Sequence, residues 1–219
     1  MAISKVTLNG TTLMDATTAT AAAADITAPK TAMLANGVVT TGTGSGGGGG
    51  ADAVLRQIAA LGENGLRYAS IGEVCFFEKL TTLGLRCLSN LTQTKIIVLP
   101  VVKTMSSYYV TDNDFVETID VGSSITGNFG SWALSGNVSL TKLIIRSTNV
   151  ISLGNINAFY NTAFESGKAG GTLYVPSALI SSYQSATNWS TILGYATNSI
   201  QSIEGSIYET QYADGTPIT

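Results

Sequence analysis

The chain has 219 residues, of which 44% are hydrophobic and 11% are charged, and its formal net charge is −3. This apolar share is large enough for a packed core, which argues against a disordered protein. The chain has no run of Lys and Arg, so we expect no nucleic-acid-binding surface, because such a surface needs clustered cations to neutralise phosphates. Its longest apolar runs have the length of a strand, so we expect no membrane insertion.

Residues 1–43 contain two Asn-Gly pairs, at positions 9 and 36, and each pair separates two β-prone runs. Asn-Gly between such runs favours a β-hairpin, because both turn residues must accept a positive φ. A short helix is expected between the hairpins, at 16–25. We therefore predict that residues 1–43 form a small β-rich module for attachment or oligomerisation, since a unit of this size needs a partner surface to be stable.

Residues 44–51 are mostly glycine and predict a flexible linker. The run also matches the G-x-G-x-x-G pattern of dinucleotide-binding proteins, but polyglycine matches that pattern in several registers and no βαβ unit surrounds it. After the linker, Asp52 can cap a helix that would end at Gly62. The side chains expected on the apolar face of this helix are those of Val54, Leu55, Ile58, Ala59 and Leu61.

Short apolar phrases recur through the rest of the chain at intervals of roughly 22 to 30 residues, a period that is typical of solenoids. Each phrase alternates, so two of its side chains would face inward and be covered by the next phrase. We expect one stacked column of Ile97, Ile119, Leu143 and Leu173. A second apolar pair follows most phrases, such as those that end at positions 105 and 153. The phrase at 80–85 does not fit, because the next one follows too soon.

Beyond the last phrase, Ser177 can cap a helix with Leu179, Ile180, Tyr183 and Ala186 on one face, followed by Trp189 and Ile192 as anchors. We expect this helix to cover the last repeat of a body that spans residues 52–200. Residues 201–219 read as a polar β-like tail with a turn at Asp214-Gly215.

Several of these phrases resemble a known family. Residues 71–85 and 157–161, with the LYVP phrase at 173–176 and the helix that follows it, resemble BspA-like leucine-rich-repeat proteins. Residues 25–44 resemble a small module of phage and prophage structural proteins, although Pro29 before Lys30 departs from its usual phrase. The resemblance implies a mainly β fold: a short leucine-rich-repeat solenoid capped by helices, preceded by the hairpin module and the glycine linker. It also implies a virion component without catalytic residues.

The residue types needed for common catalytic and metal sites are scarce. The chain has no histidine, which removes Ser-His-Asp and Cys-His arrangements and histidine metal sites. Asp112 and Asp114 read as a polar turn, and Glu117 and Asp120 as solvated residues on an outward face. The two cysteines, at positions 75 and 87, read as reduced core residues. We therefore expect no catalytic, cofactor-binding or metal-binding residues.

A group of aromatic residues offers the one candidate binding surface. One interpretation is a stacking platform for a surface glycan, because an aromatic ring presents a flat apolar face. The other interpretation is that the rings fill space between repeats. The residues concerned are Tyr108, Tyr109, Phe115 and Trp132, with Phe129 nearby in the sequence.

Three classes of function remain open. The first is a phage virion structural protein of the fibre, tail or capsid decoration type, found in the virion and assembled in the host cytoplasm. Its N-terminal module would contact other virion proteins or form a homo-oligomer, with a trimer favoured, and its body would face a host surface glycan or protein. The second is a bacterial surface or secreted leucine-rich-repeat adhesin, although no signal-peptide pattern is visible. The third is a carbohydrate-active enzyme, against which the lack of histidine and the few acidic residues argue.

Overall fold

The computed structural model describes residues 5–8, 11–15, 31–33, 39–41, 50–105, 107–165, 167–168, 170–194 and 198–218, with side chains from residue 54 onward. Near the N-terminus, β1 (Lys5–Leu8) pairs antiparallel with β2 (Thr11–Asp15), and β3 (Thr31–Met33) pairs antiparallel with β4 (Val39–Thr41). Both expected strand pairs are confirmed. The Asn-Gly turns, the helix expected at 16–25 and the glycines at 44–49 lie outside the described residues.

The first helix of the body is shorter than the sequence pattern indicated. Helix α1 (Gly50–Gln57) begins two residues before Asp52, so Asp52 lies in its first turn and is not its capping residue. It ends before Leu61, which lies in a short strand, β5 (Ala60–Leu61), paired with β7 (Thr82–Leu83). The prediction of a helix that continues through Leu61 was wrong, because this residue has a β-partner 22 positions later in the chain.

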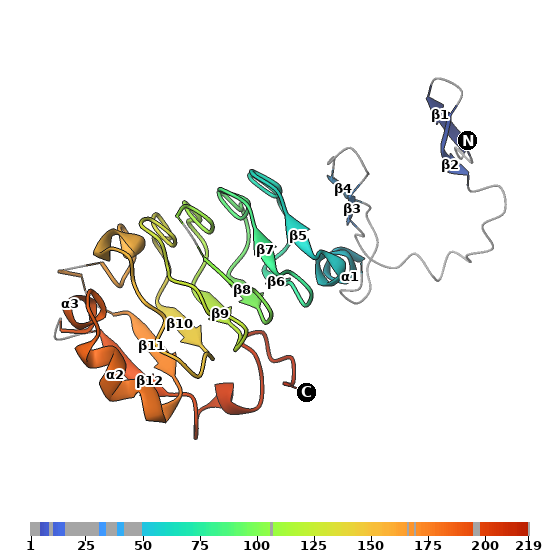
Figure 1. Ribbon diagram of the computed structural model, residues 1–219. Coiled ribbons are helices and arrows are strands. Elements are labelled where there is room, and N and C mark those ends of the chain that lie inside the picture. Colours follow the sequence, from blue (N-terminus) through green and yellow to red (C-terminus); the bar gives the residue numbers. More distant parts are fainter. Residues whose placement is uncertain are drawn as a thin grey trace.

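A six-stranded parallel sheet forms one side of the body (Figure 1). Each strand is hydrogen-bonded to the next one in the chain, except that β7 lies outside this sheet. Ile97 pairs with Ile119, Ile119 with Leu143, and Leu143 with Leu173, and all four side chains are fully buried. The predicted column is confirmed. The strands are β6 (Val74–Phe76), β8 (Ile96–Leu99), β9 (Thr118–Val121), β10 (Lys142–Ile145), β11 (Thr172–Val175) and β12 (Ser199–Ser202).

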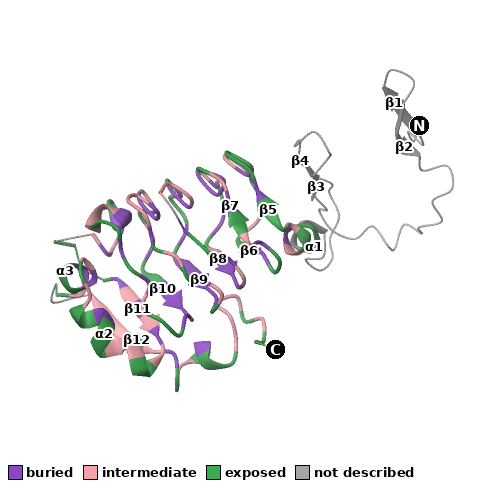
Figure 2. Ribbon diagram, in the orientation of Figure 1, coloured by how far each residue is buried: buried purple, intermediate pink, exposed green. Residues whose placement is uncertain are grey.

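The inner face of this sheet lines the main hydrophobic core. Two side chains per strand point inward in β8 to β11, as the alternating phrases predicted. Figure 2 shows that β8, β9 and β10 are largely buried, whereas buried and half-buried residues alternate in β11. Burial of an aliphatic side chain of this size stabilises a fold by about 1.5–3 kcal/mol, so the stacked pairs supply much of the driving force for folding. The inward pairs are Ile97 and Leu99, Ile119 and Val121, Leu143 and Ile145, and Leu173 and Val175.

A second column of parallel pairing accounts for the phrase at 80–85. Leu83 pairs with Leu61, and further along the body Phe129 bridges in parallel to both Met105 and Leu153. All five side chains are buried in the main core. The phrase at 80–85 therefore belongs to this second column. In the six-stranded sheet, the partner of Ile97 on the preceding strand, β6, is Cys75.

Two short helices lie against the last part of the sheet. A 3-10 turn (Ser177–Leu179) leads into α2 (Ile180–Ser185), and α3 (Trp189–Leu193) follows. Trp189 is fully buried, as is Ile192, which confirms both anchors. The prediction that Ser177 caps the helix was wrong: Pro176 occupies the capping position, and Ser177 is the first residue of the 3-10 turn, with its backbone N–H donating to the carboxylate of Glu204. Another 3-10 turn (Ile156–Phe159) precedes β11.

The tail after β12 covers the outer face of the sheet. It contains a 3-10 turn (Ile207–Glu209) and then crosses the strands toward β6 (Figure 1). The ring of Tyr208 lies 4.8 Å from that of Tyr174 on β11, and the ring of Tyr212 lies 5.3 Å from that of Phe76 on β6. The turn at Asp214-Gly215 is confirmed, since the Gly215 N–H donates to the carbonyl of Tyr212. The tail thus forms a small second apolar cluster on the outer face, in which Ile144, Ile203 and Tyr208 are buried.

Asp120 lies under this tail and is fully buried, so the prediction that it faces solvent was wrong. Its carboxylate receives a two-fold hydrogen bond from Arg146 and one from the backbone N–H of Ala213. Burial raises the pKa of Asp120, and the Arg146 guanidinium and the Ala213 N–H oppose this effect. Glu117, in contrast, is exposed.

Cys75 and Cys87 are both buried, as expected for core thiols. Burial raises the pKa of the Cys87 thiol to about 12. Among the described helices, none is both long enough and apolar enough to cross a bilayer.

Candidate functional site

Four connections in the body share an unusual backbone feature. In the segments that lead into β6, β8, β9 and β10, two residues four positions apart have a positive φ. Backbone hydrogen bonds join each segment to the next; for example, the Arg86 N–H donates to the carbonyl of Tyr108 at 2.7 Å. Side chains at matching positions therefore lie along one edge of the body. The pairs are Asn64 and Tyr68, Arg86 and Asn90, Tyr108 and Asp112, and Trp132 and Gly136.

Several of these positions hold residues that the backbone does not favour. Gly and Asn adopt the left-handed region readily, but most other L-residues do so at a cost of roughly 1–2 kcal/mol. Tyr108 has a φ of 61° and Trp132 a φ of 64°. Strained backbone positions cluster at functional sites, so the side chains of Tyr108 and Trp132 are candidates for a binding role.

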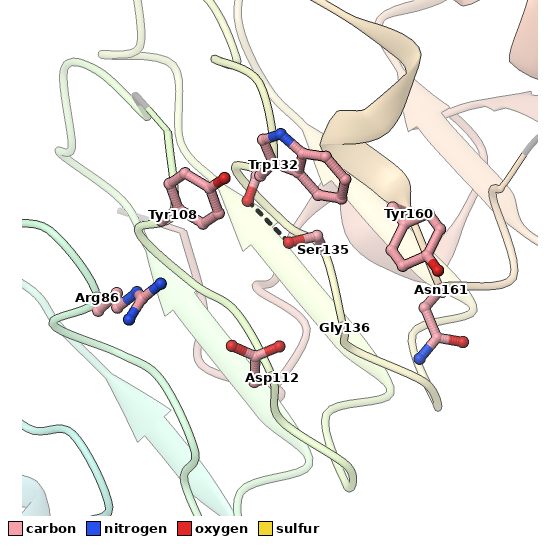
Figure 3. Close-up of a pocket in the computed structure, with 8 residues that line it drawn as sticks. All are labelled: Arg86, Tyr108, Asp112, Trp132, Ser135, Gly136, Tyr160 and Asn161. Atoms are coloured by element: carbon pink, nitrogen blue, oxygen red, sulfur yellow. Dashed lines mark hydrogen bonds between the residues drawn. The ribbon is translucent and has the colours of Figure 1, made fainter.

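The side chains at the first position of three of these pairs, together with Tyr160, form a row. The rings of Tyr108 and Trp132 are parallel, with centroids 6.2 Å apart, and the ring of Tyr160 meets Trp132 edge-on at 5.3 Å. At the other end, the guanidinium carbon of Arg86 lies 5.5 Å from the centroid of Tyr108. We name these four residues the aromatic row. Figure 3 shows its three rings side by side along one side of a hollow.

This first hollow has a volume of about 320 Å³ and is bounded on its other side by polar groups (Figure 3). Asp112 reaches across Gly136, where an added Cβ would lie only 2.3 Å from a carboxylate oxygen of Asp112. Gly136 thus makes room for the carboxylate as well as accepting a φ of +74°. The full lining is Arg86, Tyr108, Asp112, Trp132, Ser135, Gly136, Tyr160 and Asn161.

A second hollow of about 210 Å³ adjoins the first, because Asp112 lines both. Its apolar walls include two of the most exposed aromatic side chains of the described residues, Tyr68 at 62% and Phe115 at 53%. The guanidinium of Arg67 lies over the Tyr68 ring. The other lining residues are Asn90, Leu91, Thr92 and Asp114.

Asp112 is the central polar group of both hollows. It is exposed, and within the described residues its carboxylate has no hydrogen-bond or ion-pair partner. Arg86 likewise has no ion-pair partner there. Asn161 accepts a hydrogen bond from Lys168 at 3.2 Å. The site therefore combines flat apolar rings with a carboxylate that is free to accept hydrogen bonds from a ligand.

The structure brings together some of the aromatic residues named from the sequence and separates others. Tyr108 and Trp132 lie in the aromatic row, and Phe115 lines the second hollow. Tyr109 is half-buried against the main core. Phe129 is fully buried in the second column and contacts Trp189, so it is a packing residue.

Sequence reasoning missed Arg86, Asp112 and Tyr160 as members of the site. The spacing of Arg86, Tyr108 and Trp132, at 22 and then 24 residues, was a usable signal, because it equals the spacing of the paired strands beside them. Tyr160 breaks that spacing and could not have been found in this way. Among the described residues, no group of three or more Cys, Asp and Glu side chains could hold a metal ion.

No protein-family model, curated protein or solved structure matches the chain.

Proposed function

We propose that the chain is a non-enzymatic virion structural protein of the fibre, tail or decoration type, whose exposed body serves attachment. In this proposal residues 1–43 bind other virion proteins or form a homo-oligomer, and residues 52–200 face outward. The observation that carries the attachment role is the aromatic row: three of its side chains, those of Arg86, Tyr108 and Trp132, stand at successive left-handed positions, and all four line an open hollow.

The finer fold belongs to the same proposal: the body is a short leucine-rich-repeat solenoid of the BspA-like type. The sequential parallel strands support it, and so does a buried asparagine ladder. The Asn113 amide donates to the side-chain oxygen of Asn137 at 2.9 Å and to the carbonyl of Leu88 at 3.0 Å. The Asn137 amide in turn donates to the carbonyl of Val110 at 2.8 Å. Such a ladder satisfies the backbone groups of connections that turn sharply and are buried.

The chemistry of the sequence supports a non-enzymatic role. The chain has no histidine, and the pair of neighbouring acids considered from the sequence is split by the fold, since Asp120 is buried with Arg146 while Glu117 is exposed. The acids at the surface site, Asp112 and Asp114, lie beside aromatic walls, which is a composition that suits binding.

The test of this function is the composition of purified particles. Particles from a culture that produces the chain are separated by density gradient, and their proteins are quantified by mass spectrometry. We expect the chain in the particle fraction at a fixed ratio to the other structural proteins. Its recovery only in the cell-wall or medium fraction would refute the virion role and favour the second candidate, a bacterial surface adhesin.

Light scattering coupled to size exclusion separates the same two candidates in solution. A stable homotrimer or a higher ring of the full chain agrees with a fibre or decoration protein, because such oligomers are symmetric and closed. A monomer at all concentrations would favour the adhesin.

A further inference from the structure

We infer that the two adjoining hollows form one binding site for a neutral oligosaccharide. This inference rests on the proposed attachment function and names the ligand class of its exposed site. Three features of the site point to this ligand class: its flat apolar faces, its hydrogen-bonding groups and its charge.

The apolar faces suit pyranose rings. The C–H face of a sugar packs on an aromatic ring, and the amphipathic rings of Trp and Tyr serve such contacts well. In the first hollow Trp132 and Tyr160 meet at an interplanar angle of 66°, so their rings form two walls of a corner and not one flat surface. In the second hollow Tyr68 and Phe115 supply the exposed rings.

The polar groups suit vicinal hydroxyls. The Asp112 carboxylate accepts hydrogen bonds but cannot donate any, and hydroxyl groups are its natural donors. Because Asp112 lines both hollows, one carboxylate can bind hydroxyls of two successive sugar units. Asn161 adds a side-chain amide to the first hollow, and Asn90 adds one to the second.

The charge of the lining argues for a neutral ligand. The residues that line the two hollows include one cation, Arg86, and two carboxylates, those of Asp112 and Asp114. Of the cations beside the lining, Lys168 is paired with Glu165 and Arg67 lies over the Tyr68 ring. Asp112 lies where the hollows meet and Asp114 lines the second hollow, so the acid group of a sialic or uronic acid bound beside them would be repelled. The hollows are also small: their volumes lie near or below the lower end of the range for small-molecule sites, about 300–1,000 Å³. This size suits a few sugar units better than the broad surface of a protein partner.

The experiment uses the full chain on an array that carries neutral hexose and N-acetylhexosamine oligosaccharides beside sialylated and uronic-acid glycans. We expect signals from neutral members only. The best neutral oligosaccharide is then titrated by calorimetry against the wild-type chain and four variants. Trp132→Ala should weaken binding at least about tenfold and Asp112→Asn about tenfold, which corresponds to roughly 1.4 kcal/mol. Trp132→Phe should retain most of the affinity, because it keeps a ring at the same place.

Val138→Ala is the matched control, since Val138 is exposed, lies six residues from Trp132 and lines neither hollow. Circular dichroism melting curves establish that each variant is folded. Fluorescence gives a second readout: of the two tryptophans, Trp189 is fully buried and Trp132 is partly exposed, so bound sugar should change the emission of the wild-type chain but not of Trp132→Phe.

Four outcomes would overturn the inference: no neutral glycan binds, acidic glycans bind more strongly, folded Trp132→Ala binds normally, or the array stays blank while the chain binds a host protein through this face. Each of them leaves the particle-composition result untouched. A chain that is present in particles but fails on the array is thus a virion protein without a glycan site. A chain that binds neutral glycans but is absent from particles keeps the site and loses the virion role.

Discussion

Arg146 and Asp120 form a buried ion pair that joins the sheet to the C-terminal tail. The Nε and Nη2 atoms of Arg146 each donate to a different carboxylate oxygen of Asp120 at 2.8 Å. Two further N–H groups of Arg146 donate to the tail, to the carbonyls of Tyr208 at 2.6 Å and Gln211 at 2.9 Å. Each guanidinium nitrogen of Arg146 and each carboxylate oxygen of Asp120 thus has a hydrogen-bond partner. Two charges can be buried without a large penalty only when their polar atoms are paired in this way.

Arg146→Met should destabilise the protein by about 3–5 kcal/mol, because it leaves the Asp120 carboxylate buried without its cation. The double variant Asp120→Leu with Arg146→Met should lose less than Arg146→Met alone, since it removes both charges and fills the space with apolar atoms. Urea unfolding monitored by circular dichroism measures both differences. A double variant less stable than the single one would show that the tail depends on the hydrogen bonds of the pair and not on its charge balance.

Leu143→Asp should unfold the body. Leu143 is fully buried between Ile119 and Leu173 in the stacked column, so an aspartate there would be an unpaired charge in the core, at a cost on the order of 3–5 kcal/mol. Ile145→Asp should act in the same way. Glu117→Gln is the control, and because Glu117 is exposed it should leave stability within about 0.5 kcal/mol of the wild type. A cooperative thermal transition of Leu143→Asp at the wild-type temperature would contradict the inward column.

Gly122→Ala should destabilise the protein by about 1–3 kcal/mol, in the manner of an overpacked core. A Cβ at this position would lie 1.8 Å from the backbone oxygen of Pro100, so the connections after β8 and β9 would have to move apart. Gly62→Ala is a matched glycine control, since a Cβ there meets no atom within 4 Å and its φ is not in the left-handed region. Differential scanning calorimetry of the two variants tests the contrast; equal melting temperatures would show that the two connections can separate freely.

Stability should fall as the pH rises from 9 toward 12. Burial raises the pKa of the Cys87 thiol from 9.0 to about 12 and that of the Tyr183 hydroxyl from 10.0 to about 12. Above pH 9 the unfolded chain therefore loses protons that the folded chain still holds, and the free energy of unfolding decreases with pH. The two protonated groups, the Cys87 thiol and the Tyr183 hydroxyl, contribute fully to the stability of the fold below pH 9, and this contribution is lost as the pH approaches 12.

Urea unfolding at a series of pH values measures this decline, and Tyr183→Phe is the informative variant. It removes the hydroxyl that accepts a hydrogen bond from the Ile151 N–H at 3.0 Å, so it should be less stable than the wild type near neutral pH. Its decline between pH 10 and 12 should nevertheless be shallower, because one titrating group is gone. An unchanged slope would mean that Tyr183 ionises as readily in the folded chain as in the unfolded one.

Arg86→Asn should raise the free energy of unfolding by up to about 1 kcal/mol. Arg86 is exposed with a φ of 53°, and asparagine tolerates that region better than arginine does. Asn64 already occupies the matching position of the preceding connection. The loss of the cation–π contact with Tyr108 offsets part of the gain. Chemical denaturation gives the sign, and a destabilised Arg86→Asn would show that the contact with Tyr108 outweighs the backbone cost.

The periodic apolar phrases allowed the inner face of the body to be predicted. Alternation within each phrase indicated which side chains point inward, and Ile97, Ile119, Leu143 and Leu173 do pair in register. The buried anchors Trp189 and Ile192 and the two strand pairs near the N-terminus were predicted as well. These are local signals, since each depends on the spacing of side chains along a single segment.

What only the tertiary structure decided depends on segments far apart in the chain. Asp120 reads as an outward residue of its strand, and only the return of the tail 93 residues later, at Ala213, buries it. The left-handed backbone that aligns Tyr108 and Trp132 is likewise set by hydrogen bonds to neighbouring connections. The spacing of apolar residues in the sequence could place the paired strands, because each strand repeats the same local pattern. It could not place the tail or the hollow beside Asp112, because long-range contacts leave no period to read.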